Sequence, residues 1–302
     1  MITTKPTMQT KTKVILDTDI GTDIDDALAL AYLLKEPRCE LLGVTTVTGE
    51  ANLRAEMCSA ICHNIGRGCV PIHVGCDRAM LVDIMQKQAQ QAAALGAWRR
   101  DRFATKNTAI EFLRATIRAN PGEVTLIAIG PMTNVGLLFA TDPEIPALLR
   151  ELVLMCGMFR LVGGEWNAIN DPHATAVTYG NTMHAKPPRH TSFGIDVTRK
   201  CVWPAAECRE KFSGIPVLAP VRDFAEIWFQ RASHITFHDP LAAACIFHPD
   251  ICRYETGEVK ISLHEPTLGW TVFRPDANGP HIVASEVDVP RFFDTFLNTI
   301  KQ

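Results

Sequence analysis

Short apolar runs alternate with helical patterns through the first half of the chain, and this alternation limits the fold more than any other feature. The runs are rich in Val and Ile and are predicted to form strands at 13–16, 42–47, 71–74, 124–129 and 152–155. Helical patterns begin at residue 27, cover 52–65 and 108–119, and begin again at 133. Strands that alternate with helices form parallel sheets with crossover helices. The sequence therefore predicts an α/β fold: an open, mostly parallel sheet flanked by helices.

The C-terminal part of the chain has a different pattern. Closely spaced strands are predicted at 259–263, 270–273 and 281–287, followed by a last amphipathic helix over 290–300. Such strands fit a small antiparallel appendage on the parallel sheet. No linker rich in Pro, Gly or Ser divides the chain, and the polar segment 87–107 is expected to be a helix or a mobile flap. We expect a single domain over 1–302, with residues 1–12 flexible.

Charge and composition narrow the class of partner. The net charge of -3 supplies no basic field that would attract nucleic acid or an anionic membrane. No run of 18 apolar residues occurs and no apolar stretch of signal-peptide length follows the N-terminus, so we expect a cytoplasmic protein. The ten cysteines form no CxxC pair, and Cys58 and Cys62 beside His63 fall short of four zinc ligands. A small-molecule ligand is expected.

Five carboxylates crowd into ten residues directly after the first predicted strand. They are Asp17, Asp19, Asp23, Asp25 and Asp26. Like charges this close raise one another's pKa and repel, which implies a bound cation, a shared proton, or both. Ligands of open α/β sheets bind beyond the carboxyl ends of the strands, where this run lies. Asp23 or Asp25 could instead serve only as a helix N-cap, but capping does not need five acids.

The donor atoms in this run favour a hard cation. Because no His or Cys lies near the acids, calcium or magnesium fits better than zinc. Calcium takes 6 to 8 oxygen ligands, so distant segments must contribute. His238 and Asp239 precede another helical pattern, LAAACIF. The carboxylate of this pair could bind the metal while the imidazole supplies or takes a proton. The alternative for this pair is an exposed turn before Pro240.

Two further polar segments stand where strand ends are expected. The first, 163–167, contains Glu165 and Asn167, which would project to the same side of an extended chain and could hold neighbouring sugar hydroxyls. A surface turn is an equally good interpretation of this segment. The second, 129–134, has Gly and Pro in an irregular turn that leaves main-chain carbonyls free, and carbonyls are usable calcium ligands.

Six segments in this order resemble the nucleoside hydrolases that include the inosine-uridine preferring enzymes. The segments are DTDIGTDIDDALAL, VTTVTGE, AIGPMTN, MCG with GEWN and NDPHA, FGIDVT, and HDPLA. The resemblance extends from Val14 to about Val287. It implies a calcium-dependent hydrolase that cuts the N-glycosidic bond of ribonucleosides to give free base and ribose. Members of that family form dimers and tetramers, so a homodimer or homotetramer is expected.

The resemblance also implies roles for individual residues. Calcium would be held by Asp19, Asp26, the main-chain carbonyl of Ile129 and Asp239. Asp25 would take a proton from the calcium-bound water, and His238 would assist departure of the base as an acid. The transition state would resemble an oxocarbenium ion. Glu165 and Asn167 would hold the ribose hydroxyls, and Met155 would pack on the sugar.

The chain departs from the family pattern in three places. The acidic motif is two residues longer than DTDPGxDD, and the Ala-Leu-Ala that follows aligns Asp25 and Asp26 with the family pair, leaving Asp23 as the inserted acid. Glu50 stands where the family more often has Asn, and its carboxylate could accept a hydrogen bond from a sugar hydroxyl. Segment 77–107 replaces a loop that helps to line the base pocket.

The preferred base is therefore not predicted. Trp98, Trp166, Trp228 and Phe229 are candidates for stacking on a base, and ordinary core packing is the alternative for each.

Two other functions compete with nucleoside hydrolysis. The spacing of Asp17, Asp19 and Gly21 after a strand also looks like the nucleophile motif of magnesium-dependent phosphatases of the haloacid dehalogenase type. That family needs a distal acidic segment that is not found here, and it leaves HDPLA and GEWN unexplained. A non-catalytic nucleoside or sugar binder would fit the inserted residues and the altered loop. The presence of Asp25 and His238 argues against such a binder.

Overall fold

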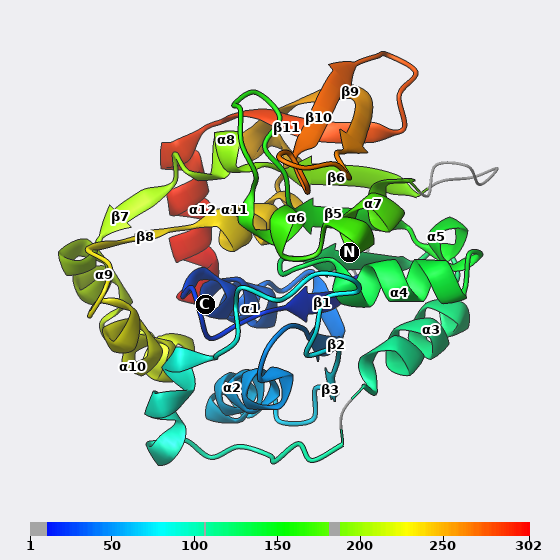
Figure 1. Ribbon diagram of the computed structural model, residues 1–302. Helices are drawn as coiled ribbons and strands as arrows, with labels where there is room; N and C mark the ends of the chain where they lie inside the picture. The colour runs from blue at the N-terminus through cyan, green and yellow to red at the C-terminus, as the bar shows by residue number, and fades with distance from the viewer. Residues whose placement is uncertain (1–10, 106, 181–187) are drawn as a thin grey trace, which may run out of the picture.

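The computed structural model describes residues 11–105, 107–180 and 188–302 (Figure 1). Among these residues, nine strands form one sheet in the order β10-β9-β11-β6-β5-β4-β1-β2-β3, and β7 and β8 form a separate pair. The strands are β1 (Thr12–Thr18), β2 (Cys39–Thr46), β3 (Ile72–Val74), β4 (Val124–Ala128), β5 (Glu151–Met155), β6 (Arg189–Phe193), β7 (Val202–Pro204), β8 (His234–Thr236), β9 (Cys252–Ile261), β10 (Thr271–Pro275) and β11 (His281–Val287).

Parallel pairing runs from β3 at one edge of the large sheet as far as β11. At the opposite edge, β9 pairs antiparallel with both β11 and β10. The predicted mostly parallel sheet with a small antiparallel part near the C-terminus is confirmed. Two details differ. β11 runs parallel to β6, and β6 itself was not predicted, because its sequence RHTSF has polar side chains where the pattern requires an apolar run.

Helices cover both faces of the sheet. They are α1 (Asp25–Lys35), α2 (Ala51–Asn64), α3 (Ala109–Ala119), α4 (Thr133–Thr141), α5 (Ile145–Leu148), α6 (Trp166–Asn170), α7 (Pro172–Gly180), α8 (Ile195–Thr198), α9 (Ala205–Phe212), α10 (Ala219–Trp228), α11 (His238–Cys245) and α12 (Val289–Ile300). The described residues also form the 3₁₀ helices η1 (Gln90–Ala97), η3 (Pro216–Leu218) and η4 (Pro249–Ile251).

The core consists of two main apolar clusters, one on each face. Along β1, Val14 and Leu16 belong to one cluster and Ile15 to the other, because successive side chains of a strand point to opposite faces. Figure 1 shows α1, α11 and α12 on one side of the sheet and α3, α4 and α7 on the other. Every residue of α1 from Asp25 to Leu34 is buried, so this helix lies centrally and carries its acids into the interior.

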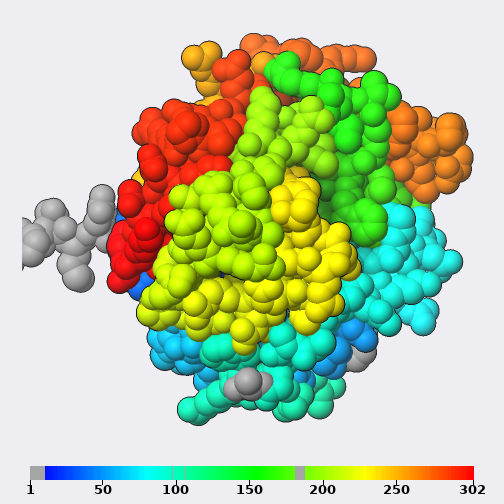
Figure 2. Space-filling model, turned by 90° about the vertical axis from the view of Figure 1, so that its left-hand side faces the viewer, coloured from blue at the N-terminus to red at the C-terminus, as the bar shows by residue number. Residues whose placement is uncertain are grey.

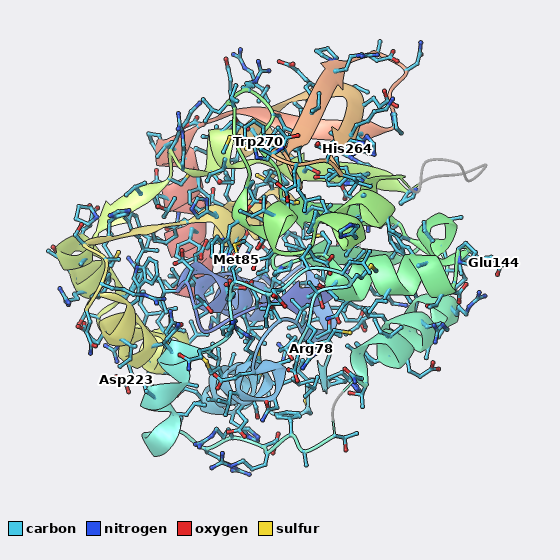
Figure 3. The ribbon with its side chains drawn as sticks, in the orientation of Figure 1. Arg78, Met85, Glu144, Asp223, His264 and Trp270 are labelled. Atoms are coloured by element: carbon cyan, nitrogen blue, oxygen red, sulfur yellow. The ribbon has the colours of Figure 1, made fainter. Side chains whose placement is uncertain are left out.

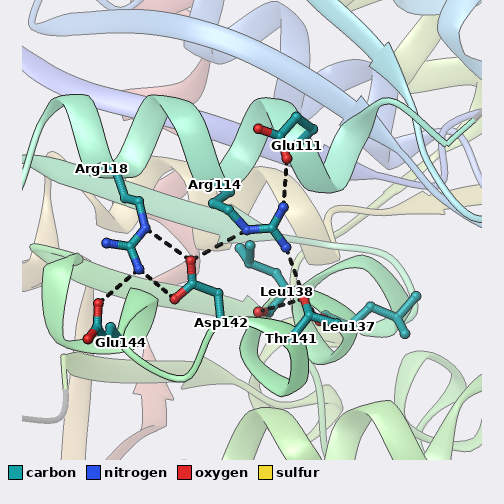
Figure 4. A network of polar contacts seen from close by, with 8 residues as sticks. All are labelled: Glu111, Arg114, Arg118, Leu137, Leu138, Thr141, Asp142 and Glu144. Atoms are coloured by element: carbon teal, nitrogen blue, oxygen red, sulfur yellow. Dashed lines mark hydrogen bonds and ion pairs between the residues drawn. The ribbon is translucent and has the colours of Figure 1, made fainter.

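An ion-pair network joins α3 to the end of α4 (Figure 4). Arg118 binds the carboxylates of Asp142 and Glu144, and Arg114 binds Glu111 and Asp142. The side chains are partly exposed, so the network adds little to stability. None of these residues lines the cavity described below.

Segment 77–107 crosses the molecule beside α10 and α2. Where a helix or a mobile flap was expected, the segment contains the 3₁₀ helix η1, and η1 packs against α10, as Figures 1 and 2 show. Figure 3 shows Arg78 and Met85 on the part of the segment that precedes η1. The side chains of Gln86, Ala89 and Gln91 are buried, so this part of the segment packs against the rest of the protein.

The expectation for residues 1–12 falls outside the described residues except at its end, where Thr12 already begins β1. Across residues 11–105, 107–180 and 188–302, no helix has both the length and the apolar character needed to cross a membrane.

Candidate functional site

A cavity of about 310 Å³ opens beyond the carboxyl ends of β1, β4 and β5. It lies where ligands bind in open α/β sheets. Segments far apart in sequence meet here because α1, α6 and α11 all begin at this edge of the sheet. The predicted site residues that line the cavity are Asp19, Asp25, Asp26, Ile129, Met155, Glu165, Asn167, His238 and Asp239.

Short hydrogen bonds fix the acidic run between β1 and α1. Thr18 Oγ1 donates to Asp26 Oδ1 over 2.5 Å, and Asp23 Oδ1 accepts from the N–H of Ile24 over 2.6 Å. The N-cap of α1 is Ile24, and no side chain caps the helix. The alternative that Asp23 or Asp25 is simply a helix cap is therefore wrong.

Three buried carboxylates form the centre of the site. Oxygen atoms of Asp25, Asp26 and Asp239 lie within 4.8 Å of one another. Burial raises the pKa of all three well above the usual range, and repulsion from neighbouring acids of the cavity raises it further. The main-chain N–H of Asp239 donates to Asp25 Oδ2 over 3.2 Å. Buried oxygens of this kind fit a hard divalent cation, which would remove the repulsion.

The guanidinium of Arg54 lies near this cluster but does not pair with a carboxylate by a hydrogen bond. It is fully buried and donates to the main-chain carbonyls of Asp19, Ile20 and Gly49. Its charge lowers the pKa of Asp19 and Asp26, against the larger effect of burial. Arg54 therefore holds the backbone of the acidic run and does not itself occupy a carboxylate oxygen.

Asp19 borders the cavity beside this group. Its Oδ2 accepts from Gln86 Nε2 over 2.6 Å, and burial raises its pKa. A Cβ at Gly130 would lie 2.8 Å from Asp19 Oδ1, so only glycine leaves room for the carboxylate at this point. The close group of three acids contains Asp25 and not Asp19, whereas the predicted ligand set contains Asp19 and not Asp25. Both acids reach the cavity.

Asp17 lies behind the site and does not line the cavity. Its Oδ1 accepts from Thr45 Oγ1 over 2.5 Å and from Asn134 Nδ2 over 2.7 Å, while burial raises its pKa to about 7. Asp23 does line the cavity, and burial raises its pKa to about 6, with Arg231 opposing that shift. The acids of the run are therefore not equivalent.

Glu165 and Asn167 form the opposite wall. Glu165 caps α6: Oε1 accepts from the N–H of Asn167, and Oε2 accepts from the N–H groups of Gly157 and Ala168. Asn167 Nδ2 donates to the carbonyls of Ile129 and Met155 over 2.8 and 3.0 Å. Both side chains are buried, so the surface-turn interpretation is wrong. The assumed extended geometry is also wrong, because Asn167 belongs to a helix.

His238 and Asp239 begin α11 and line the cavity, so the exposed-turn alternative is wrong. The Nδ1 of His238 pairs with Thr198 Oγ1 over 2.7 Å. Burial lowers the pKa of His238 to about 4, with His234 adding to the shift, so the imidazole is neutral at pH 7. A neutral imidazole held at Nδ1 has its other ring nitrogen available for a hydrogen bond.

Glu50 is not among the cavity residues, contrary to the prediction for a sugar ligand. It is the N-cap of α2 with a φ of 61°. Its Oε2 accepts from the main-chain N–H of Ala89 over 2.9 Å. The carboxylate is thus engaged in anchoring segment 77–107, whose course could not be predicted from the motif.

Sequence reasoning missed several residues of the lining, among them Gln86 and Arg231. Gln86 links two walls, since its Nε2 donates to Asp19 and its Oε1 accepts from Trp166 Nε1 over 2.6 Å. It lies in the segment that departs from the family, where no motif marks it. Arg231 follows α10 and lies over the ring of Trp228.

Two of the four aromatic candidates reach the cavity, namely Trp166 and Trp228. The other two have structural contacts elsewhere. Trp98 Nε1 donates to Asp223 over 3.0 Å, and the ring of Phe229 lies under the guanidinium of Arg209.

Comparisons with known proteins agree with this geometry. The family model of the inosine-uridine preferring nucleoside hydrolases matches residues 14–294. Uridine nucleosidase 1 of Arabidopsis thaliana is 26% identical, over 86% of this chain and 81% of its own. A pyrimidine-specific ribonucleoside hydrolase of Escherichia coli is 29% identical, over 87% of each chain. The structure of a purine-preferring ribonucleoside hydrolase from Gardnerella vaginalis aligns with a TM-score of 0.79 and 26% identity, covering 96% of this chain and 98% of the other.

The match runs from β1 into α12 and includes all three segments that supply acids to the cavity, namely the run after β1, Glu165 and Asp239. It does not favour the phosphatase alternative. The protein belongs to the inosine-uridine preferring nucleoside hydrolase family and is a ribonucleoside hydrolase that acts on N-glycosidic bonds.

Proposed function

We propose that the protein hydrolyses ribonucleosides to free base and ribose in a calcium-dependent reaction. The observation that carries this proposal is the group of buried carboxylates of Asp25, Asp26 and Asp239, in a cavity whose negatively charged side chains all offer oxygen ligands. Oxygen ligands favour calcium or magnesium, and a site with many carboxylates and a nearby carbonyl suits the larger ion.

The residues proposed to hold the ion are Asp19, Asp26, Asp239 and the carbonyl of Ile129. When bound, calcium supplies a Lewis acid that polarises a water molecule and orients the ribose 2′ and 3′ hydroxyls. The Ile129 carbonyl already accepts from Asn167, but a carbonyl oxygen has two lone pairs and retains one.

Asp25 is proposed to take the proton of the attacking water. Its carboxylate is held in place by the N–H of Asp239, so its geometry does not depend on the substrate. As the glycosidic bond lengthens, positive charge develops on the ribosyl group. The surrounding carboxylates stabilise that charge, because they lie in a buried site where electrostatic interactions are strong.

Glu165 and Asn167 are proposed to orient the ribose, with Met155 packing against it. A carboxylate has about four positions for hydrogen bonds, and three main-chain N–H groups occupy three of those of Glu165. The thiol of Cys156, a weak donor, also forms a hydrogen bond with this carboxylate. His238, held by Thr198, is proposed to assist departure of the base through its other ring nitrogen.

A panel of purine and pyrimidine ribonucleosides tests this function and identifies the base. Base is measured by chromatography and ribose as reducing sugar, with sugar phosphates assayed in parallel for phosphate release. We expect base and ribose from at least one nucleoside and no phosphate. Phosphate release without base would favour the phosphatase. Nucleoside binding in calorimetry, with no product over hours, would favour the non-catalytic binder.

We also propose that residues 1–302 form a single nucleoside hydrolase domain, supported by the one large sheet that draws strands from both ends of the chain. A cytoplasmic homodimer or homotetramer that releases bases for salvage is the form in which we expect it to act. Light scattering after size-exclusion chromatography tests the assembly.

A further inference from the structure

Arg54, on α2, carries a positive charge in the interior of the protein. Its side chain is fully buried and does not line the cavity. A buried guanidinium costs free energy unless hydrogen bonds satisfy its N–H groups. The proposed reaction gives Arg54 no chemical step, so the reason for a charge at this position lies in the groups that the guanidinium binds.

The three nitrogens of the guanidinium bind three different segments of the chain. Nη1 serves the acidic run, Nε serves the loop before α2, and Nη2 serves segment 77–107. The acceptors are the main-chain carbonyls of Asp19, Ile20, Gly49 and Gln88 and the Oγ1 of Thr22. The hydrogen bonds to Gly49 and Gln88 span 2.9 and 3.4 Å. The planar fork of an arginine can reach all three segments at once.

The same three segments also contact one another directly. The main-chain N–H of Gln91 donates to the carbonyl of Gly21 over 3.1 Å, and its Nε2 donates to the carbonyl of Thr22 over 3.2 Å. A Cβ at Gly49 would lie 2.4 Å from the carbonyl oxygen of Lys87, so the two backbones touch there. The guanidinium therefore lies at a junction where segment 77–107 packs against the acidic run and the loop before α2.

This junction holds Asp19 from two sides. Arg54 binds its main-chain carbonyl, while Gln86, from segment 77–107, donates to its Oδ2 over 2.6 Å. We propose that Arg54 is a positioning residue for the cation site, because it holds the three segments in the arrangement in which Asp19 faces the cavity. The proposal rests on the proposed function, in which Asp19 is a calcium ligand.

Positioning predicts a change in calcium affinity that the charge of Arg54 alone does not explain. Protein that loses the arrangement must recover it when calcium binds, so the apparent Kd rises by the inverse of the fraction that remains competent. Lysine keeps the positive charge, but its donors all lie on one nitrogen, which cannot serve three segments. Arg54→Lys therefore separates the hydrogen bonds of Arg54 from its charge.

Calorimetric titration of the folded, metal-free protein with calcium alone measures this affinity. For Arg54→Lys we expect the Kd to rise by about 10- to 100-fold, the usual contribution of groups that orient metal ligands. With uridine or inosine, kcat at saturating calcium should return to within about threefold of wild type, because the bound ion then selects the competent arrangement.

Two further variants guard against a general loss of structure. Thr22→Val keeps the guanidinium and removes one of its acceptors, so the Kd should rise by roughly fivefold even if Arg54→Lys does not fold. The matched control is Arg38→Lys. Arg38 also donates to a main-chain carbonyl, that of Phe247, and pairs with Glu36, but it does not line the cavity. Its calcium Kd should equal that of wild type.

An unchanged Kd in Arg54→Lys and Thr22→Val would overturn the proposal, and so would an equal rise in Arg38→Lys. A loss of kcat that persists at saturating calcium would overturn it as well. In each of these cases wild type still binds calcium and hydrolyses nucleosides, so the proposed function stands. If wild type binds no calcium, the proposed metal site fails and the role of Arg54 fails with it.

Discussion

Asp23 and Asp25 are two residues apart, both line the cavity, and only one of them is proposed as the base. Their surroundings differ. Asp25 lies in the close group with Asp26 and Asp239, whereas Asp23 accepts from its neighbour Ile24 and faces Arg231. At this scale function depends on which oxygen atom each side chain leaves free, and a motif in the sequence does not reveal that.

Asp25→Asn keeps the shape of the side chain and removes its ability to take a proton. We expect kcat on nucleosides to fall by roughly 10²- to 10⁴-fold, the usual contribution of a general base. Asp23→Asn should lower kcat by much less. Initial rates at saturating calcium measure both. The reverse order of the two effects would show that the alignment of the acidic motif is wrong.

Gln86→Ala removes the hydrogen bonds to Asp19 and to Trp166. Partners that orient metal ligands contribute about 10- to 100-fold to metal affinity or activity, so the calcium concentration giving half-maximal activity should rise by about that factor. Gln88→Ala is the control, because the hydrogen bonds at Gln88 use its main-chain carbonyl. Identical calcium titrations for Gln86→Ala and Gln88→Ala would rule out a role for the Gln86 side chain.

At the scale of elements, the site is built from strand ends and helix starts, and these were the parts best predicted. β1, β4 and β5 are buried apolar runs, so their periodicity gave both their positions and the edge where the acids lie. β6 has a polar sequence, yet it is buried by neighbours distant in the chain. The path of segment 77–107 depends on contacts with α2 and α10, which no local pattern encodes.

Burial of β6 and β11 predicts acid sensitivity. His190 on β6 and His281 on β11 are register partners, and their rings lie 4.8 Å apart. Burial lowers the pKa of both histidines below the ordinary value of about 6.5. Their contribution to stability is therefore complete above about pH 6.5 and is lost as the pH falls, because protonation favours the unfolded chain.

His190→Phe retains a ring and cannot be protonated. Between pH 7.5 and 5.0 the free energy of unfolding of wild type should fall by about 2 kcal/mol more than that of the variant, from 1.36 kcal/mol per pH unit below 6.5. Urea unfolding of both proteins at several pH values measures the difference. The cavity acids are the same in both proteins, so their contribution to the pH dependence cancels. Parallel pH curves for the two proteins would contradict the role of His190.

For the molecule as a whole, the buried acids of the cavity cost free energy in the folded state, and the proposed cation would offset that cost. Burial and repulsion from neighbouring acids raise the pKa of Asp25, Asp26 and Asp239, so ionising all three carboxylates in the metal-free fold costs free energy. The sheet nevertheless brings Asp25 and Asp26 together with Asp239, which lies far along the chain. This arrangement fits a fold that a bound cation would stabilise.

Calcium should therefore stabilise the folded protein by about 2.7 kcal/mol at a concentration 100 times its Kd. Thermal unfolding in calcium and in chelator measures the shift. Arg118→Ala, in the network of Figure 4 and away from the cavity, should retain it, whereas Asp26→Asn should lose most of it. Equal melting temperatures for wild type with calcium and with chelator would contradict a metal site.

The most direct test of the account is the yield of base and ribose from a nucleoside with calcium-loaded protein, with the same protein after chelation, and with the protein after calcium is restored. The account predicts equal amounts of base and ribose, loss of both on chelation and recovery of both with calcium. Base release that is unaffected by chelation, or no release from any nucleoside, would contradict it.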